Sequence, residues 1–272
     1  MKITEAIKLL SRLPKNPVGV YDELKVRREL RREHSKISPP SYQPEDFEKV
    51  VSEIERCLQQ DLRGFLTESA LAEIEETVRQ NIEKISKTEI PFPLTHNGDP
   101  KLGKLCYIIC RAIKPRVFVE TGVAFGVTSS FILKALEVNN YGKLFSVDRP
   151  PAVRNAAEFI GALIPDELRR NWNLYRGESQ KLLPALLAEL KGVNIFLHDS
   201  RHTYSNMSAE FRLVAPFLAN RSFLLADDAN RNIAFEEWTN RTNPAYRATI
   251  AEDSKESLFG VSFFREKPSY RQ

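Results

Sequence analysis

Acidic residues follow each of five short apolar segments that lie beyond residue 116. The segments are typical of β-strands, because apolar residues occur in short runs bounded by turn-forming residues. Parallel strands end at the same edge of a sheet, and ligands bind beyond that edge. Any one acid could instead cap the next helix, so the whole set carries the argument. The acids are Glu120, Asp148, Glu178, Asp199, Asp227 and Asp228.

A glycine-containing turn after the first segment predicts the kind of ligand. Gly122 and Gly126 let the backbone turn sharply and approach a bound molecule closely. The turn lacks the Gly-x-Gly-x-x-Gly triplet of dinucleotide sites, and Glu120 just before it would repel a pyrophosphate. An acid suits a ligand with an amino group and a sulfonium. Asp148, after the second segment, can accept hydrogen bonds from both hydroxyls of a ribose.

Three aspartates after the fourth and fifth segments predict a cation site. Asp199, Asp227 and Asp228 would repel one another unless they are protonated or neutralised by a cation. Mg²⁺ prefers such oxygen ligands and lowers the pKa of a hydroxyl that it binds. The alternative is that Asp227 and Asp228 cap the next helix or pair with Arg231.

His202 is the predicted general base, and with Asp199 it forms the predicted catalytic pair. Its imidazole titrates near neutral pH and comes three residues after Asp199. His198 is the competing histidine. Because it comes directly off the fourth segment, a buried structural role is its alternative.

The elements around these residues predict an α/β fold. Helical patterns over 102–113, 127–136 and 207–217 alternate with the strands, which favours a parallel sheet covered by helices on both faces. Two further segments, 245–250 and 258–264, predict a closing hairpin-like pair. The five apolar segments are 117–119, 143–148, 173–175, 193–197 and 222–226.

The first hundred residues show a different sequence pattern from the rest of the chain. Apolar stripes predict amphipathic helices over 47–58 and 71–85, and arginines interleaved with glutamates over 25–33 favour a solvated helix face. Three prolines and an Asn97–Gly98 turn mark a linker over 87–100. We therefore predict a helical extension at 1–95, serving as a lid or an oligomer surface, and a second domain at 96–272.

Composition excludes several classes of protein. Hydrophobic residues at 42% and charged residues at 28% are typical of a globular chain. A net charge of +4 does not indicate nucleic-acid binding. Cys57, Cys106 and Cys110 fit neither a disulfide framework nor a zinc site, and no run approaches the ~18 apolar residues of a membrane span. We expect a cytoplasmic protein without a membrane or nucleic-acid partner.

From residue 101 onward the chain resembles the class I S-adenosylmethionine-dependent methyltransferases. The resemblance lies in 117–126, in Asp148, in 177–179 and in 196–204. The last stretch is similar to the Asp-Gly-x-His-x-Tyr segment of a subgroup that acts on small hydroxylated molecules, with Ser200 replacing the glycine. Residues 224–228 resemble the metal-binding strand end of cation-dependent O-methyltransferases.

The resemblance implies a Rossmann-like sheet of seven strands, the last one antiparallel, and roles for individual residues. Asp148 would bind the ribose of the cofactor, and Glu178 or Ser179 the adenine edge. The other residues implied to contact the cofactor, chiefly at its methionine end, are Glu120, Gly122, Gly126 and Asp199.

These inferences converge on one hypothesis with two alternatives. The hypothesis is O-methylation of a small hydroxylated acceptor, such as a sugar, polyketide or phenol, by direct displacement on S-adenosylmethionine, with Mg²⁺ as the candidate metal. One alternative is a non-catalytic nucleotide-binding module whose helical extension binds a protein partner. The other is a metal-dependent hydroxylase or hydrolase on the same scaffold. Assembly into a homo-oligomer stays open.

Overall fold

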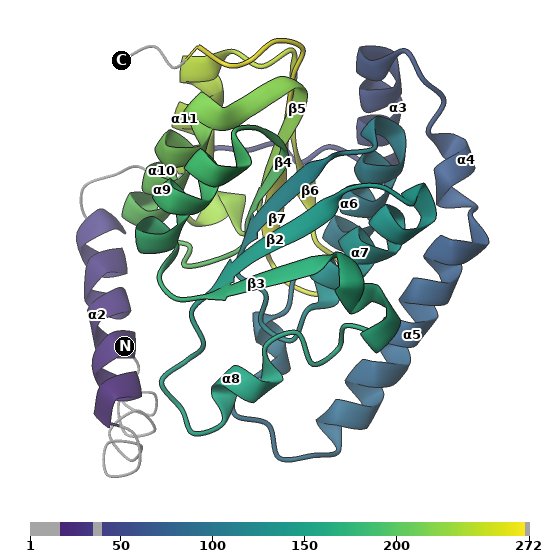
Figure 1. Cartoon of the computed structure of the whole chain (residues 1–272). Helices are drawn as coiled ribbons and strands as arrows, with labels where there is room; N and C mark the ends of the chain where they lie inside the picture. Colours follow the sequence, from purple (N-terminus) through teal and green to yellow (C-terminus); the bar gives the residue numbers. More distant parts are fainter. Residues whose placement is uncertain (1–16, 35–39, 270–272) are drawn as a thin grey trace.

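A seven-stranded sheet lies at the centre of the computed structural model, which describes residues 17–34 and 40–269 (Figure 1). The strand order is β3-β2-β1-β4-β5-β7-β6, and β7 runs antiparallel to both of its neighbours. This order confirms the predicted Rossmann-like sheet. The strands are β1 (Val117–Thr121), β2 (Lys143–Asp148), β3 (Trp172–Arg176), β4 (Val193–His198), β5 (Leu218–Ala226), β6 (Tyr246–Ala251) and β7 (Leu258–Phe264).

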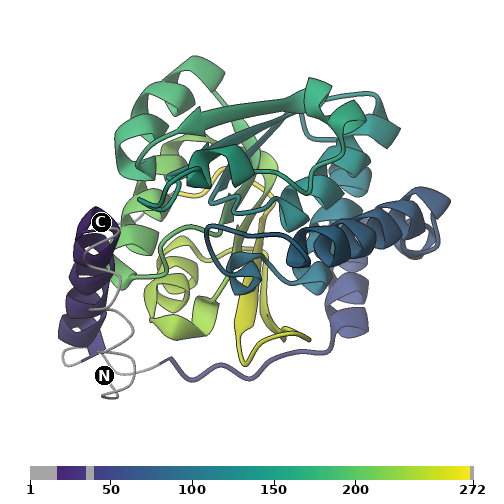
Figure 2. The same ribbon diagram turned by 90° about the horizontal axis from the view of Figure 1, so that it is seen from below.

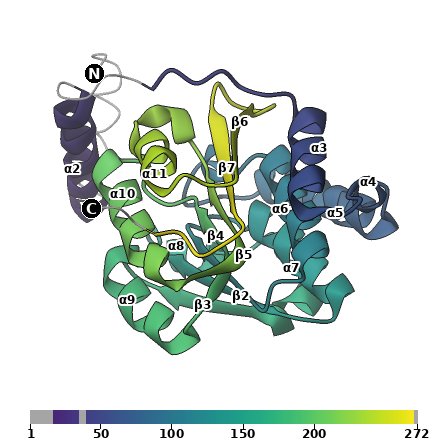
Figure 3. The same cartoon turned by 90° about the horizontal axis from the view of Figure 1, so that it is seen from above.

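Helices cover both faces of the sheet (Figure 3). One face packs against α9 (Ser179–Leu190), α10 (Tyr204–Val214) and α11 (Ala234–Thr242), and the other against α6 (Pro100–Ile113) and α7 (Val127–Asn139). Alternate strand residues point to opposite faces, so Phe118 joins the α6–α7 core and Val119 joins the α9–α10 core. The continuous burial of β1 follows from this double cover.

The predicted N-terminal helices are present as α3 (Phe47–Leu58) and α5 (Ser69–Ser86), joined by the short α4 (Arg63–Leu66). Asp46 begins α3 by accepting hydrogen bonds from two backbone amides of the first turn. The stripes of α3 and α5 pack into the same core as α6 and α7. The boundary near residue 95 stays a prediction, and it does not separate two hydrophobic cores.

Helix α2 (Pro17–His34) lies beside α10, on the opposite side of the molecule from α5 (Figure 2). Lys25, Arg28 and Arg31 are exposed on it, which confirms the solvated face predicted for this segment. Glu29 faces the protein and accepts hydrogen bonds from Thr203 and Ser205. The extension therefore contacts the segment that follows β4.

Several strand boundaries differ from the prediction by a residue or more, and the differences are largest in β1 and β5. Strand β1 continues to Thr121, so Glu120 lies inside the strand and not after it, because β1 pairs with β2 and β4 through that residue. Strand β5 begins four residues earlier than predicted, at Leu218. The short helices are α8 (Ala156–Phe159), η1 (Leu94–His96), η2 (Asp166–Asn171), η3 (Ala215–Phe217) and η4 (Ala229–Arg231).

The cysteines behave as small apolar side chains. Cys106 and Cys110 are buried in α6 as free thiols, and Cys57 is a half-buried free thiol in α3. Among the helices of residues 17–34 and 40–269, none combines the length and the apolar character needed to cross a bilayer.

Candidate active site

The edge at the carboxyl ends of β1, β4 and β5 brings the predicted aspartates together. Strand pairing continues one residue beyond each strand: the Asp199 amide donates to the Thr121 oxygen at 2.8 Å, and the Asp227 amide donates to the His198 oxygen at 2.8 Å. Asp199 and Asp227 therefore lie side by side, as the sequence predicted for the ends of neighbouring parallel strands.

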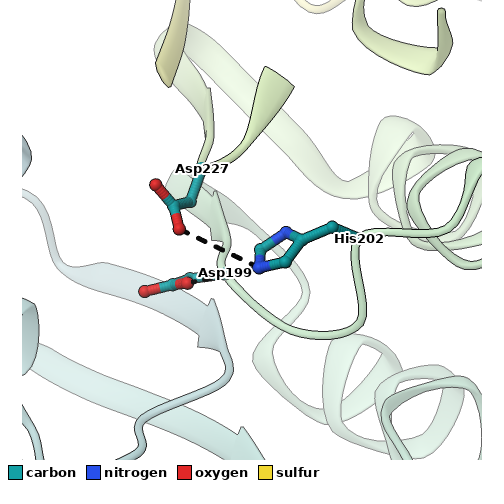
Figure 4. A group of neighbouring side chains, drawn as sticks. All are labelled: Asp199, His202 and Asp227. Carbon is teal, nitrogen blue, oxygen red and sulfur yellow. Dashed lines mark ion pairs between the residues drawn. The ribbon is translucent and has the colours of Figure 1, made fainter. Parts of the chain in front are cut away.

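His202 faces these carboxylates from the loop after β4 (Figure 4). Its Nε2 lies 3.9 Å from Asp199 Oδ1, 3.9 Å from Asp227 Oδ2 and 3.6 Å from Asp228 Oδ2. One ligand atom each from Asp199, His202 and Asp227 lie within 4.8 Å of one another. Opposite ligands of an octahedral Mg²⁺ are about 4.2 Å apart, so the two aspartate oxygens of this group fit a divalent cation after a small shift.

Burial and mutual repulsion control the protonation of this cluster. Burial, followed by the charge of Asp227, raises the pKa of Asp199 well above its usual range. Burial also acts to raise the pKa of Asp227, but the neighbouring Glu252 carboxyl and the positive charges nearby outweigh it and lower that pKa to about 2. Asp227 is thus the more acidic member of the pair, and Asp199 the less acidic.

Asp228 has two further partners on its Oδ1 oxygen. Arg231 Nε lies 3.3 Å from its Oδ1, and the Ser257 hydroxyl donates to the same oxygen. The pairing with Arg231 that the sequence left as an alternative is therefore present. The Oδ2 atom of Asp228 still faces His202.

The loop between β6 and β7 adds two charged residues that the sequence interpretation missed. Glu252 is 7% exposed, and burial together with Asp227 raises its pKa to about 9. Lys255 Nζ lies 3.9 Å from both Asp227 Oδ2 and Glu252 Oε2. The signal was available, because Glu252 follows the predicted 245–250 segment just as the other acids follow their strands.

The turn after β1 is shaped by Gly122 and by the buried Glu120. Gly122 has φ +86°, and a Cβ there would lie 1.9 Å from the Asp199 backbone oxygen, so this position requires glycine. Glu120 Oε1 accepts hydrogen bonds from Ser129 at 2.6 Å and Ser146 at 2.5 Å. Burial raises the pKa of Glu120 to about 7, although the two serine hydroxyls act to lower it.

The Asp148 side chain is hydrogen-bonded to the backbone of the same turn. Its Oδ2 accepts hydrogen bonds from the Val123 amide at 2.6 Å and the Ala124 amide at 3.0 Å. Burial raises the pKa of Asp148, and these two amides oppose the rise. Two amides that could bind a phosphate are thus already taken by a carboxylate.

The structure separates Glu178 from the aspartate cluster. Glu178 pairs on the surface with Lys181 at 2.8 Å and Arg149 at 3.4 Å. The neighbouring Ser179 hydroxyl points inward and donates to Glu210. Gly126, the remaining predicted cofactor residue, has φ +93° and precedes the first turn of α7.

Glu210 of α10, a third residue that the sequence interpretation missed, accepts hydrogen bonds from five residues beneath the site. Its donors include Thr121 Oγ1 at 2.6 Å, Ser200 Oγ at 2.8 Å and His198 Nδ1 at 2.6 Å. The signal was an acid on the apolar stripe of α10. The other donors come from Ser179 and Asn206.

His198 lies in the buried position that its alternative role required. Its ring is fully buried, with Nδ1 on Glu210, and its centroid is 5.5 Å from that of His202 in an edge-to-face arrangement. Of these two histidines, His202 is the partly exposed one, at 25% of its side chain, so it is the one that an acceptor could reach.

The linker before α6 packs against this site. Asn97 Oδ1 accepts a hydrogen bond from the Phe125 amide at 3.3 Å. A Cβ on Gly98 would lie 2.3 Å from Thr128 Oγ1 and 3.2 Å from Asp199 Oδ2. The linker thus covers the space between the β1 turn and the aspartates.

Comparison with known proteins shows that the same segment is similar to a methyltransferase domain. Residues 119–229 match a family described as a methyltransferase domain. The match begins in β1 and ends just after Asp228, so it contains the predicted site residues from Glu120 to Asp228. No curated protein matches the chain.

Solved O-methyltransferase structures share the fold. The O-methyltransferase from Bacillus cereus, in complex with SAH, aligns with a TM-score of 0.56 at 14% identity, covering 80% of this chain and 100% of that one. TomG from Streptomyces achromogenes, an O-methyltransferase involved in tomaymycin synthesis and solved with SAM, gives 0.51 at 13% identity over 79% and 96%. At these identities the likeness shows the fold alone.

Proposed function

We propose that this protein is an S-adenosylmethionine-dependent O-methyltransferase of a small hydroxylated acceptor. The observation that carries the proposal is that the segment matching a methyltransferase domain is the one whose strand ends bring Glu120, Asp148, Asp199 and Asp227 to one edge of the sheet.

The cofactor would lie along the turn after β1. Glu120, Gly122 and Gly126 would line its methionine end, close to Asp199. Both loop-amide hydrogen bonds of Asp148 go to Oδ2, which leaves Oδ1 for the ribose hydroxyls. Of the two candidates for the adenine edge, Glu178 keeps an exposed carboxylate, whereas Ser179 is directed to Glu210.

Asp199 and Asp227 would hold a divalent cation, with Asp228 as the third predicted ligand. The fit rests on the convergence of these oxygens and on Asp227 Oδ1, a buried atom that no donor reaches among the described residues. Mg²⁺ prefers carboxylate oxygen to imidazole, which leaves His202 as the base. Bound there, Mg²⁺ would lower the pKa of the acceptor hydroxyl.

His202 would take the acceptor proton on Nε2. Burial lowers the pKa of His202 despite the opposing charges of Asp228 and Asp227, so the ring is neutral and basic at pH 7. The imidazolium that forms would be stabilised by carboxylates 3.6 to 3.9 Å away. The acceptor oxygen then bonds to the methyl carbon, while the carbon–sulfur bond breaks and its electron pair stays on sulfur.

The helical extension would border the acceptor. Glu29 of α2 contacts Thr203 and Ser205, directly after His202. Of the two roles predicted for the extension, lid or oligomer surface, this contact of α2 favours the lid. It also brings Arg201 within 3.8 Å of Glu29.

Titration of the purified chain with S-adenosylmethionine and with NAD tests the proposal. We expect S-adenosylmethionine to bind and NAD not to bind, and the opposite result would refute the assignment. A panel of sugars, phenols and polyketides with Mg²⁺ then tests turnover. Cofactor binding without any demethylated product would favour the non-catalytic module, and metal-dependent turnover without the cofactor would favour the hydroxylase or hydrolase.

A further inference from the structure

The β6–β7 loop places the ammonium group of Lys255 beside the aspartate cluster. Lys255 Nζ lies 3.9 Å from Asp227 Oδ2 and 3.9 Å from Glu252 Oε2, and its side chain is 23% exposed. At this distance the ammonium forms ion pairs with both carboxylates without donating a hydrogen bond. The contact is electrostatic, so a metal cation could take the place of the Lys255 ammonium group.

The position of this loop is fixed by a buried residue. Asp99 Oδ2 accepts hydrogen bonds from the Asp253 amide at 3.1 Å and the Ser254 amide at 2.8 Å. Its Oδ1 accepts from the Lys101 amide at the start of α6 at 2.8 Å. Asp99 therefore joins the loop to the start of α6, and these hydrogen bonds hold Lys255 near the aspartates.

Buried oxygens near Lys255 lack donors. Asp227 Oδ1 and both carboxylate oxygens of Glu252 are fully buried, and no hydrogen-bond donor reaches them within the described residues. Buried acids in this state are costly unless a cation approaches, so these oxygens themselves indicate a site for positive charge.

We propose that Lys255 is an internal counter-cation that competes with a divalent cation for the carboxylates at this edge, and that Glu252 strengthens the attraction for that cation. The inference rests on the proposed function, because it concerns the metal site of the same reaction. Lys255 offsets part of the negative charge when no metal is bound. A divalent cation must then bind against its repulsion or displace it.

Two volume-preserving substitutions should change metal affinity in opposite directions. Lys255→Met removes the competing charge, so we expect Mn²⁺ to bind about ten-fold more tightly, as Coulomb's law gives for a unit charge about 5 Å from a divalent ion in a water-like medium. Glu252→Gln removes a carboxyl that can ionise beside the bound cation, so it should weaken Mn²⁺ binding. The exposed Lys267→Met is the matched control and should leave affinity unchanged.

The measurement is the dissociation constant of Mn²⁺ for the full chain, from the electron paramagnetic resonance signal of the unbound ion, without S-adenosylmethionine. Loss of affinity in both variants, or no change in Lys255→Met, overturns the inference, because loop damage would weaken both. If Lys255→Met does not fold, judged by circular dichroism, Lys255→Gln replaces it with the same expectation.

The outcome for the wild-type chain separates this inference from the proposed function. If the wild type binds no Mn²⁺ and Lys255→Met does, the inference is supported and only the predicted Mg²⁺ requirement fails. If neither binds, the inference is overturned. Titration with S-adenosylmethionine decides the methyltransferase assignment independently in each case.

Discussion

Replacing Glu210 with glutamine tests whether the buried hydrogen-bond network under the site stabilises the fold. Glu210 is fully buried and accepts hydrogen bonds from residues at the ends of β1 and β4, including Thr121, His198 and Ser200. Glutamine keeps the shape of the side chain but removes its charge. Its amide nitrogen would also face donors where a carboxylate oxygen now accepts.

The size of the effect follows from the pKa of Glu210. Burial acts to raise this pKa, but the charge of His198 and the hydrogen bonds of His198, Ser179 and Thr121 outweigh it, so the pKa falls from 4.5 to about 2. A shift of that size corresponds to about 3 kcal/mol of folding free energy. We expect Glu210→Gln to lower the free energy of unfolding at pH 7 by about 3 kcal/mol.

Urea unfolding of the full chain between pH 7 and pH 3 measures this effect. Because the folded pKa lies below the unfolded one, the stabilisation is complete above pH 4.5 and is lost as the pH falls toward 2. The difference in unfolding free energy between wild type and Glu210→Gln should therefore become smaller below pH 4.5. The exposed Glu189→Gln serves as the control. A gap under about 1 kcal/mol at pH 7, within reach of ordinary surface substitutions, would refute the reasoning.

Three further predictions concern the cofactor, the base and the turn. Asp148→Asn should weaken S-adenosylmethionine binding at least about ten-fold in calorimetry, because hydrogen bonds to a charged group are lost; unchanged affinity would exclude Asp148 as the ribose ligand. His202→Asn should leave cofactor affinity intact and slow turnover. The rise of wild-type kcat with pH should have its midpoint below 6.5, because burial lowers the pKa of His202. A midpoint above that value would contradict this assignment of the base. Gly122→Ala should lower the unfolding free energy by more than about 1 kcal/mol, because its φ is positive, whereas Gly64→Ala, with no heavy atom within 4 Å of the added Cβ, should be close to neutral.

The fold could be predicted because each step depends on local patterns. Apolar runs such as 193–197, alternating with helical periodicity such as 207–217, specify buried parallel strands with helices between them. The boundaries were less accurate. Strand β1 includes Glu120 because two serine hydroxyls satisfy its buried carboxylate, and that compensation comes from residues nine and more positions away.

The edge position of Asp199, Asp227 and His202 could be predicted for the same topological reason. The ends of parallel neighbours coincide, so a carboxylate one residue past β4 must lie near a carboxylate one residue past β5. The direction of each side chain was beyond the sequence. Ser179 turns toward Glu210 and Glu178 toward Lys181, and this choice depends on a helix some thirty residues later.

Glu252 and Lys255 show why the charge balance of the site needed the structure. Strand β7 is antiparallel to both β5 and β6, so β6 runs in the same direction as β5 and its end reaches the same edge. The order of β6 and β7 in the sheet, which no local pattern specifies, therefore decides whether the loop after β6 meets Asp227. The buried Asp99 then holds that loop in place. A site that appears purely acidic from the strand ends thus acquires a lysine, and its affinity for cations depends on the difference between these charges.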